Sequence, residues 1–556
     1  MSIICSPIML ASPYAYALTA LPSSGLDDAA AGSESAAHHL FFKGAVMTVQ
    51  FHRPTLFAAS LAATTCLATA PVLADLAPED VWTDWQRRLA EFGYTPQAQT
   101  TTDGQTLVLN NFRVSIPAEN GSTLRVDMGA VRLVPENADN VRIEYEERFD
   151  LRVFPDGDDA PSATLMFDVA QSDPRYVATG EPDAISYSYT AGDLMISLSG
   201  IDMDGADVAM NASGSLAFDG ADITYGTNPA DGGSEIVQSV NFNAVRFALD
   251  LRDDDEDTDI SISLAMQDFG NDATMRVPDG FDMSDPDMLT TADWGYDAQG
   301  KLGALRLGMS GRADGSEFEF NLRTGPNTIA ASLSGDALSY DVNQEDVVVS
   351  SIGSQIPVPI DGEIDTVSLR VKLPLRDSEE PQDFTLALNL LGLTLSDAIW
   401  GLVDAGGLLP RSPADLIIDL DGSAIVMSNL LDEAAMQALA LAGAPPMLPQ
   451  TINLNQLRLA VAGAVLEGTG AFAFTGEPSP LSAGFPSPVG SVDLDLKGAN
   501  ALLDSLISLG LMADQEAMGL RMMMGLLAES VGEDHLQSKI EMTSQGHIIA
   551  NGQRIQ

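Results

Sequence analysis

Near its centre the chain reads Ala244-Val245-Arg246-Phe247-Ala248-Leu249-Asp250-Leu251, and apolar side chains alternate there with charged or small ones. The same alternation recurs at residues 140–145 and 316–322. A period of two turns every second side chain to one face of a strand, so one face is buried and the other meets water. The pattern predicts antiparallel strands.

Turn signals separate these strands between about residues 105 and 380, and no long helical pattern lies between them. The signals are Pro135-Glu136-Asn137, Asp204-Gly205, Asp219-Gly220, Gly270-Asn271-Asp272, Gln299-Gly300 and Asp314-Gly315. We therefore expect a long antiparallel meandering sheet.

The pattern changes near residue 381, where strands and helices alternate. An order of strand, helix, strand, turn and strand occurs around residues 385–420 and again around 492–549. An alanine-rich helix at 432–442 and a hairpin at 455–468 lie between the two copies. The predicted fold class is α+β, mostly β, with a long antiparallel meandering sheet followed by C-terminal strand-helix-strand repeats.

A short amphipathic helix is expected just before the first strands. Val81, Trp85, Leu89 and Phe92 fall on one helical face, and Gly93 follows as a natural stop. Such a stripe usually packs a helix against a sheet.

Residues 47–74 have the form of a secretory signal peptide. His52 and Arg53 precede an apolar run, and Ala74 provides a small residue at the cleavage site. We expect residues 1–46 to be an over-called N-terminus, residues 75–380 an N-terminal helix with a β-rich domain, and residues 381–556 an α/β repeat domain. The expected location is the periplasm of a Gram-negative bacterium, with no transmembrane span in the mature chain.

The exported chain is strongly acidic. The whole sequence has 79 Asp and Glu and 27 Lys and Arg. Three of these acids and two of these bases precede Asp75, which leaves the exported chain with a net charge of −51. Such a field repels nucleic acid, which is therefore not an expected partner. Both cysteines, Cys5 and Cys66, precede the cleavage site, so no disulfide or thiolate site is expected after cleavage.

Few residues suit catalysis. The exported chain has two histidines, His535 and His547, and no nucleophile elbow, H-E-x-x-H motif or phosphate-binding loop. We therefore predict no catalytic residues and no cofactor. A carboxylate-dependent hydrolase stays an alternative, because two acids across a cleft can act as a pair.

Calcium is a further alternative, because three acidic clusters offer the oxygen ligands that it prefers. The clusters are Asp156-Gly157-Asp158-Asp159, Asp202-Met203-Asp204-Gly205 and Asp253-Asp254-Asp255-Glu256-Asp257-Thr258-Asp259. None has EF-hand spacing, and runs of acidic residues without such spacing are usually solvated hairpin loops. Whether a metal site exists is left open.

A methionine-rich helix is expected between Asp514 and Glu529. Leu520, Met523, Met524 and Leu527 share one face, which suits either the core against the sheet or a surface that contacts lipid.

Several short motifs resemble one bacterial family. They are Asp80-Val81-Trp82-Thr83-Asp84-Trp85, Leu395-Ser396-Asp397-Ala398-Ile399-Trp400, Leu409-Pro410-Arg411-Ser412-Pro413 and Ala550-Asn551-Gly552-Gln553. Together they are similar to the alphaproteobacterial domain of unknown function 2125 over nearly the whole exported chain. The architecture also resembles, more distantly, AsmA-like envelope proteins, which implies a role in outer-membrane lipid homeostasis.

These observations favour binding over catalysis. The leading hypothesis is an exported, envelope-associated protein that holds a lipid or another amphiphile along its sheet. The alternatives are a calcium-stabilised secreted structural protein and the carboxylate-dependent hydrolase. The identity of the ligand and the oligomeric state are left open.

Overall fold

The computed structural model describes residues 76–91, 93–117, 123–154, 164–202, 210–253, 257–281, 286–313, 315–354, 358–475 and 485–555. These residues form 26 strands and six helices, and all the strand pairs whose registers are given are antiparallel neighbours. The predicted fold class, a long antiparallel meandering sheet, is confirmed. The predicted leader at 47–74 and the segment 1–46 lie outside the described residues.

Compact packing divides the chain into two units, with the boundary between Thr227 and Asn228. This boundary falls within a strand rather than in a linker. The sequence-based division at 380/381 does not coincide with this boundary, and it stays a prediction.

Unit 1 contains one helix and a sheet in which two long strands each pair, along one edge, with two shorter strands. Its elements are α3 (Pro78–Glu91), β1 (Thr95–Asp103), β2 (Thr106–Pro117), β3 (Thr123–Pro135), β4 (Asn140–Glu144), β5 (Arg148–Phe154), β6 (Thr164–Gln171), β7 (Arg175–Glu181), β8 (Ala184–Asp202) and β9 (Met210–Ala230), which crosses the boundary. β3 pairs with both β4 and β5, and β8 with both β7 and β6.

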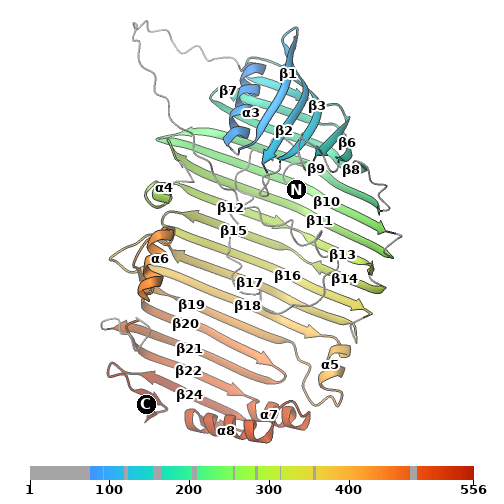
Figure 1. Cartoon of the computed structure of the whole chain (residues 1–556). Coiled ribbons are helices and arrows are strands. Elements are labelled where there is room, and N and C mark those ends of the chain that lie inside the picture. Colours follow the sequence, from blue (N-terminus) through green and yellow to red (C-terminus); the bar gives the residue numbers. More distant parts are fainter. Residues whose placement is uncertain are drawn as a thin grey trace. The chain divides into compact units, whose positions relative to one another are not determined.

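Helix α3 packs against this sheet as its apolar stripe predicts (Figure 1). Val81, Trp85 and Leu89 are at most 4% exposed. Trp85 stacks on Phe112 of β2, with ring centroids 5.8 Å apart. Gly93 ends the helix with φ of +74°, a left-handed conformation that a residue without Cβ adopts readily. Phe92 lies outside the described residues.

Unit 2 is built from long strands that follow one another as a meander. They are β10 (Gly233–Asp253), β11 (Thr258–Pro278), β12 (Gly295–Leu302), β13 (Ala304–Ala313), β14 (Ser316–Thr324), β15 (Asn327–Ser334), β16 (Ala337–Gly353), β17 (Ile360–Pro374), β18 (Gln382–Leu395), β19 (Ala414–Val426), β20 (Met447–Val461), β21 (Ala464–Thr475), β22 (Ser487–Lys497), β23 (Glu529–Gly532), β24 (His535–Met542), β25 (Ile548–Ala550) and β26 (Gln553–Arg554). β12 and β13 lie end to end along β11, and β15 and β14 lie end to end along β16.

The helices of unit 2 are inserted into the connections between strands. They are α4 (Pro286–Thr291), α5 (Asp397–Val403), α6 (Glu433–Ala442), α7 (Ala499–Ser508) and α8 (Asp514–Leu527). Strands on either side of α5, and of α6, still pair directly as antiparallel neighbours. Figure 1 shows these helices at the strand ends and at the β24 end of the sheet. The predicted strand-helix-strand segments are therefore parts of an antiparallel meander whose connections contain helices, and they are not parallel crossover units.

Three of the predicted turns are wrong because they lie inside strands. Asp219-Gly220 belongs to β9, Gly270-Asn271-Asp272 to β11 and Gln299-Gly300 to β12. Gly300 lies where the neighbouring strand leaves no room for a side chain, because a Cβ on it would lie 2.6 Å from the Ile329 side chain. A glycine in a strand marks close approach of a neighbour as readily as a turn.

A line of irregular residues crosses the middle of the long strands. Three glycine–aspartate pairs mark it: Gly303 with Asp268, Gly325 with Asp346, and Gly392 with Asp365. Gly392 has φ of +73°, and a Cβ there would lie 2.1 Å from an oxygen of Asp365. On β11, apolar positions are even-numbered before this line and odd-numbered after it. In a regular strand, even-numbered and odd-numbered residues point to opposite faces. One irregular residue shifts this alternation by one position, so the apolar side chains on both sides of the line point to the same face.

Candidate functional site

One transverse row of side chains in unit 2 is almost entirely aliphatic. Cross-strand partners in an antiparallel sheet point to the same face, so the register defines the row. From β11 to β24 its members are Ala273, Ala298, Ala331, Tyr340, Val371, Leu386, Leu420, Leu454, Gly470, Val492 and Ile540. Ten strand spacings of about 4.8 Å make it about 48 Å long.

A second row runs beside the first on the same face. Its members are Gly300, Ile329, Val342, Leu369, Leu388, Ile418, Leu457, Gly468, Leu494 and Ser538. We call the two rows together the apolar face.

The opposite face is polar along the same strands. The row next to the first apolar row reads Thr274, Asp297, Ser332, Ser339, Lys372, Thr385, Asp421, Asn453, Ala471, Ser491 and Glu541. Hydrogen bonds connect its neighbours: Asn453 donates to Asp421 over 2.7 Å, and Ser423 and Thr451 hydroxyls lie 2.9 Å apart. This face therefore carries hydrogen-bonded pairs of its own.

The apolar face is only partly buried. Most of its side chains are intermediate in exposure, and Leu386 is 38% exposed. Among the described elements, the helices of unit 2 lie at strand ends or beyond the last strands, not across the rows (Figure 1). A contiguous apolar surface of this length is more than a solvated monomer ordinarily exposes, so it is the candidate binding surface of unit 2.

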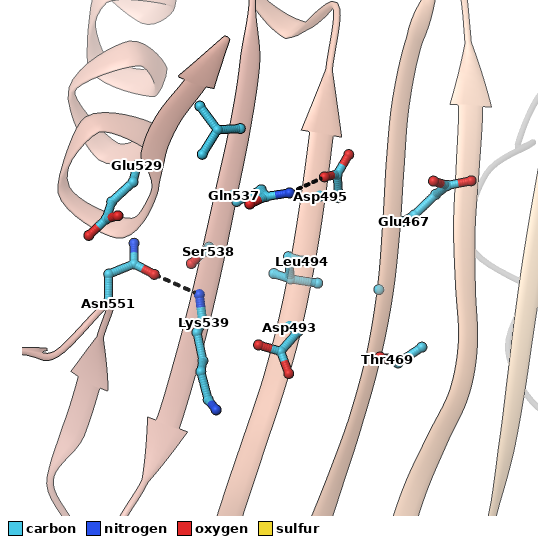
Figure 2. Close-up of a pocket in the computed structure, with 12 residues that line it drawn as sticks. Glu467, Thr469, Asp493, Leu494, Asp495, Glu529, Gln537, Ser538, Lys539 and Asn551 are labelled. Atoms are coloured by element: carbon cyan, nitrogen blue, oxygen red, sulfur yellow. Dashed lines mark hydrogen bonds between the residues drawn. The ribbon is translucent and has the colours of Figure 1, made fainter.

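A polar hollow of about 480 Å³ lies near the last strands, between β21, β22 and β24. Figure 2 shows Glu467, Asp493, Asp495 and Glu529 around it, together with Lys539. Its lining is acidic, as the carboxylate-dependent hydrolase requires, and that reaction class stays a prediction.

Asp495 is the most strongly held acid of this hollow. Gln537 donates to its Oδ2 over 2.8 Å, His535 Nε2 lies 2.7 Å from the same oxygen, and Lys497 Nζ lies 3.0 Å from Oδ1. These three partners, Gln537 first, hold the pKa of Asp495 well below its ordinary value. Asp495 is therefore a structural anchor of β22 to β24.

Asn551 closes a gap on the outer edge of β24. β23 pairs with β24 up to Gln537 and β25 pairs from Ile540, which leaves the backbone between them without a strand partner on that side. The Asn551 side chain accepts from the backbone N–H of Lys539 over 2.8 Å and donates to the carbonyl of Leu527 over 3.2 Å. Covering an edge in this way guards it against pairing with other chains.

The histidines take different places. His535 belongs to the cluster around Asp495. The sequence analysis did not identify this contact, although pairing between the two alternating strands that carry His535 and Asp495 would bring these residues close together. His547 follows a turn, and its backbone N–H donates to Thr543 Oγ1 over 3.2 Å. Within the described residues the two are not joined into one site.

The acidic clusters are only partly described. Residues 155–163, 203–209 and 254–256 lie outside the described residues, and with them most of the predicted calcium ligands. Asp257 and Asp259 flank the β10–β11 hairpin, and Asp257 Oδ1 lies 3.4 Å from Arg312 Nη1. In the described part of the chain, no group of three or more acidic, histidine or cysteine side chains is arranged to hold a metal. The calcium alternative stays untested.

The methionine-rich helix is α8, and its expected face does not form a core. Met523 is 51% exposed and Leu520 37%. Ala517 is the residue of this helix that is fully buried. Of the two interpretations, the structure favours a surface.

Unit 1 holds a buried polar cluster that sequence reasoning missed. Asp84 and Arg88 of α3 are 4% and 6% exposed and form an ion pair of 2.6 Å. Tyr187 donates to Asp84 over 2.6 Å, and Arg88 donates to the hydroxyl of Tyr225 over 2.8 Å. Burial and then the charge of Asp84 raise the pKa of Tyr187, so its hydroxyl stays a donor. The cluster fixes α3 on the sheet.

A second hollow, of about 320 Å³, lies in unit 1 and is lined partly by ion-paired residues. Arg142 Nε lies 2.9 Å from Glu136 and Arg132 Nε 3.7 Å from Glu144. Burial, and then Tyr189, raise the pKa of Tyr145 at its wall. The arginines that line this hollow already form ion pairs with glutamates of the same chain.

The motif around Leu409 shapes a loop after α5. Asp404 is completely buried and accepts from the backbone N–H groups of Leu408 and Leu409 over 2.8 and 2.9 Å. These two bonds lower the pKa of Asp404. Arg411 pairs with Asp397 at the start of α5. The motif is therefore structural.

No helix in the described part of the chain is both long and apolar enough to cross a membrane. Residues 303–543 match the model of a family described as an uncharacterized protein conserved in bacteria (DUF2125). The predicted family is confirmed over this span, whereas its extension to the rest of the exported chain, its alphaproteobacterial origin and the likeness to AsmA-like proteins stay predictions.

Among curated proteins none matches this chain. Among solved structures, the crystal structure of BauA, the ferric preacinetobactin receptor from Acinetobacter baumannii, is 8% identical, with 83% of this chain and 79% of that chain covered. Its TM-score is 0.15, so no statement about fold or function follows from it.

Proposed function

We propose that this chain is an exported, envelope-associated protein of a Gram-negative bacterium whose apolar face holds the acyl chains of a lipid or a similar amphiphile. The observation that carries the proposal is the apolar face itself, eleven strands wide and without a helix across it among the described elements. Each acyl CH₂ group that leaves water for this face contributes about 0.8 kcal/mol.

The composition of the face favours acyl chains over a protein partner. Interfaces between proteins concentrate their binding energy in Trp, Tyr and Arg. The two rows contain one such residue, Tyr340, among leucine, isoleucine, valine, alanine, glycine and serine. A flat aliphatic surface suits a ligand that is itself aliphatic and flexible.

The envelope location rests on residues 47–74, which carry the features of a cleaved leader. Amphiphiles that move through an aqueous compartment need a carrier with an apolar surface, since their chains are poorly soluble in water. An acidic exterior, with a net charge of −52 for the whole chain, keeps such a carrier dissolved.

A fluorescent hexadecanoic acid analogue tests the proposal with protein purified from the periplasm. Leu386→Glu places a charge in the first apolar row, and we expect roughly tenfold weaker binding of the probe, equivalent to about 1.4 kcal/mol. The matched control is Thr385→Glu, which adds the same charge to the neighbouring residue on the polar face. We expect the control to bind the probe as the unmodified chain does.

Two results would overturn the proposal. One is an unmodified chain that neither binds the probe nor carries an extractable amphiphile when its lipids are analysed by mass spectrometry. The other is equal loss of binding in both variants, since that would place the probe elsewhere. N-terminal sequencing of the periplasmic protein tests the leader separately.

A further inference from the structure

The outward surface of α8 is apolar and exposed. Met518 is 65% exposed, Met522 72% and Leu526 60%, and these positions are spaced by four residues along one helical face. Met523 beside them is 51% exposed. Each such side chain gains about 1.5–3 kcal/mol when it is fully buried, so this face favours a partner.

Beyond the first turn of α8, its charge lies away from that surface. After Glu516 the helix has one charged residue, Arg521. Its Nη2 donates to Asp504 of α7 over 2.6 Å, and its Nε donates to Asn500 over 3.2 Å. The outward surface of the helix therefore presents thioether and hydrocarbon groups without a competing cation.

The C-terminal end of α8 meets the apolar face of the sheet. Ser538 ends the second apolar row, and its hydroxyl donates to the carbonyl of Leu527 over 2.5 Å. Figure 1 shows α7 and α8 at the β24 end of the sheet. The exposed helix thus adjoins the surface on which the acyl chains are proposed to lie.

We propose that α8 docks on a zwitterionic phospholipid bilayer, with Met518, Met522 and Leu526 inserted among the headgroups and upper acyl chains. Methionine is flexible and adapts to a fluid, irregular surface. The strongly acidic chain is repelled by anionic lipids, and the helix face has no lysine or arginine to attract them. The inference rests on the proposed function, because docking there would let an amphiphile pass between the bilayer and the apolar face.

Flotation with phosphatidylcholine vesicles tests the docking of the full purified chain. We expect the unmodified protein to float with these vesicles, and to float less when phosphatidylglycerol is added at low salt. The variant M518Q/M522Q keeps side-chain length, and we expect its partition into vesicles to fall roughly tenfold or more. The matched control is Leu441→Gln, which replaces a leucine that is 92% exposed on α6 and should float normally.

Four outcomes would overturn the docking: no flotation of the unmodified chain, equal loss in the control, no fall in M518Q/M522Q, or self-association that only M518Q/M522Q abolishes. The last would assign the surface to a second copy. Circular dichroism checks that each variant is folded. The hexadecanoic acid probe, measured without vesicles, separates the two proposals: M518Q/M522Q should bind it normally. Flotation without probe binding would refute the proposed function alone, and probe binding without flotation would refute the docking alone.

Discussion

The two units use the same kind of strand and treat its apolar face in opposite ways. In unit 1 the helix α3 covers the sheet, and Phe112, Ile143 and Ile223 are 0%, 3% and 1% exposed. In unit 2 the rows of the apolar face are mostly intermediate in exposure, and Leu386 is 38% exposed. One face is a core, whereas the other is a surface.

This difference separates stability from function. Side chains buried by folding stabilise the chain by the full transfer from water, while half-buried ones keep part of that free energy for a partner. We therefore expect substitutions in unit 1 to change unfolding, and substitutions on the apolar face to change binding more than unfolding.

The largest effect on stability is expected at the buried ion pair that holds helix α3 against the sheet of unit 1. Arg88→Ala leaves Asp84 buried without its buried cationic partner, which should cost about 3–5 kcal/mol of the free energy of unfolding. Arg87→Ala is the matched control, because Arg87 also pairs with Asp84 but its side chain is 55% exposed. The control should cost less than about 1 kcal/mol.

Urea unfolding followed by tryptophan fluorescence measures both variants, since Trp85 lies on the same helix. Equal costs for Arg87→Ala and Arg88→Ala would show that the cluster does not fix α3.

A matched pair of leucines compares the two faces directly. Leu109→Ala in unit 1 removes a side chain that is 0% exposed and should cost about 2–5 kcal/mol. Leu386→Ala removes one that is 38% exposed and should cost roughly 1 kcal/mol or less, because little of a cavity forms. Thermal and urea unfolding of the two proteins decide the point. A cost for Leu386→Ala as large as that for Leu109→Ala would mean that the face is a core.

Much of the fold follows from the period of two, which predicts the strands and their two faces. The prediction fails where glycine and aspartate stand inside strands, as at Gly270 and Asp272. Such residues are typical of turns, and only the neighbouring strand shows that they are needed for close packing or for a change of phase. The sequence shows no local difference between these two uses.

The candidate site is also predictable only in part, because the sequence pattern shows which side chains share a face but not what packs against that face. Alternation predicts an apolar face, but whether a helix covers it depends on where distant elements pack. Asp84 and Arg88 are visible in the sequence as a pair four residues apart, yet their burial depends on Tyr187, 103 residues further along. The stripe of α8 looks like core because hydropathy alone does not distinguish a covered face from an exposed one.

A smaller effect is expected for a helix that decorates unit 2 without covering it. Asp432 caps α6 by accepting from the backbone N–H of Ala435 over 2.9 Å. Asp432→Ala should cost about 0.5–1 kcal/mol of stability and leave binding of the hexadecanoic acid probe unchanged. Glu433→Ala, one residue later, controls for the lost charge. Weaker probe binding in Asp432→Ala alone would show that α6 contributes to the apolar face.

The smallest effect is expected at Asp495, because its side chain is 26% exposed and water screens its interactions. Gln537, His535 and Lys497 hold the pKa of Asp495 below its ordinary value in the folded chain. Its contribution is therefore fully present above the ordinary pKa of about 3.9 and is lost as the pH falls toward the lower folded-state value.

Asp495→Asn should accordingly reduce the free energy of unfolding at pH 7 and flatten its decline between about pH 4 and pH 2. Asp493→Asn removes the same charge two residues earlier on the same strand and should leave that decline as steep as in the unmodified chain. Urea unfolding at stepped pH values measures both slopes. If the Asp495→Asn protein loses stability in acid as steeply as the Asp493→Asn protein, the anchor between β22 and β24 contributes nothing to the acid response, and the strands are held by their ladder and apolar rows alone.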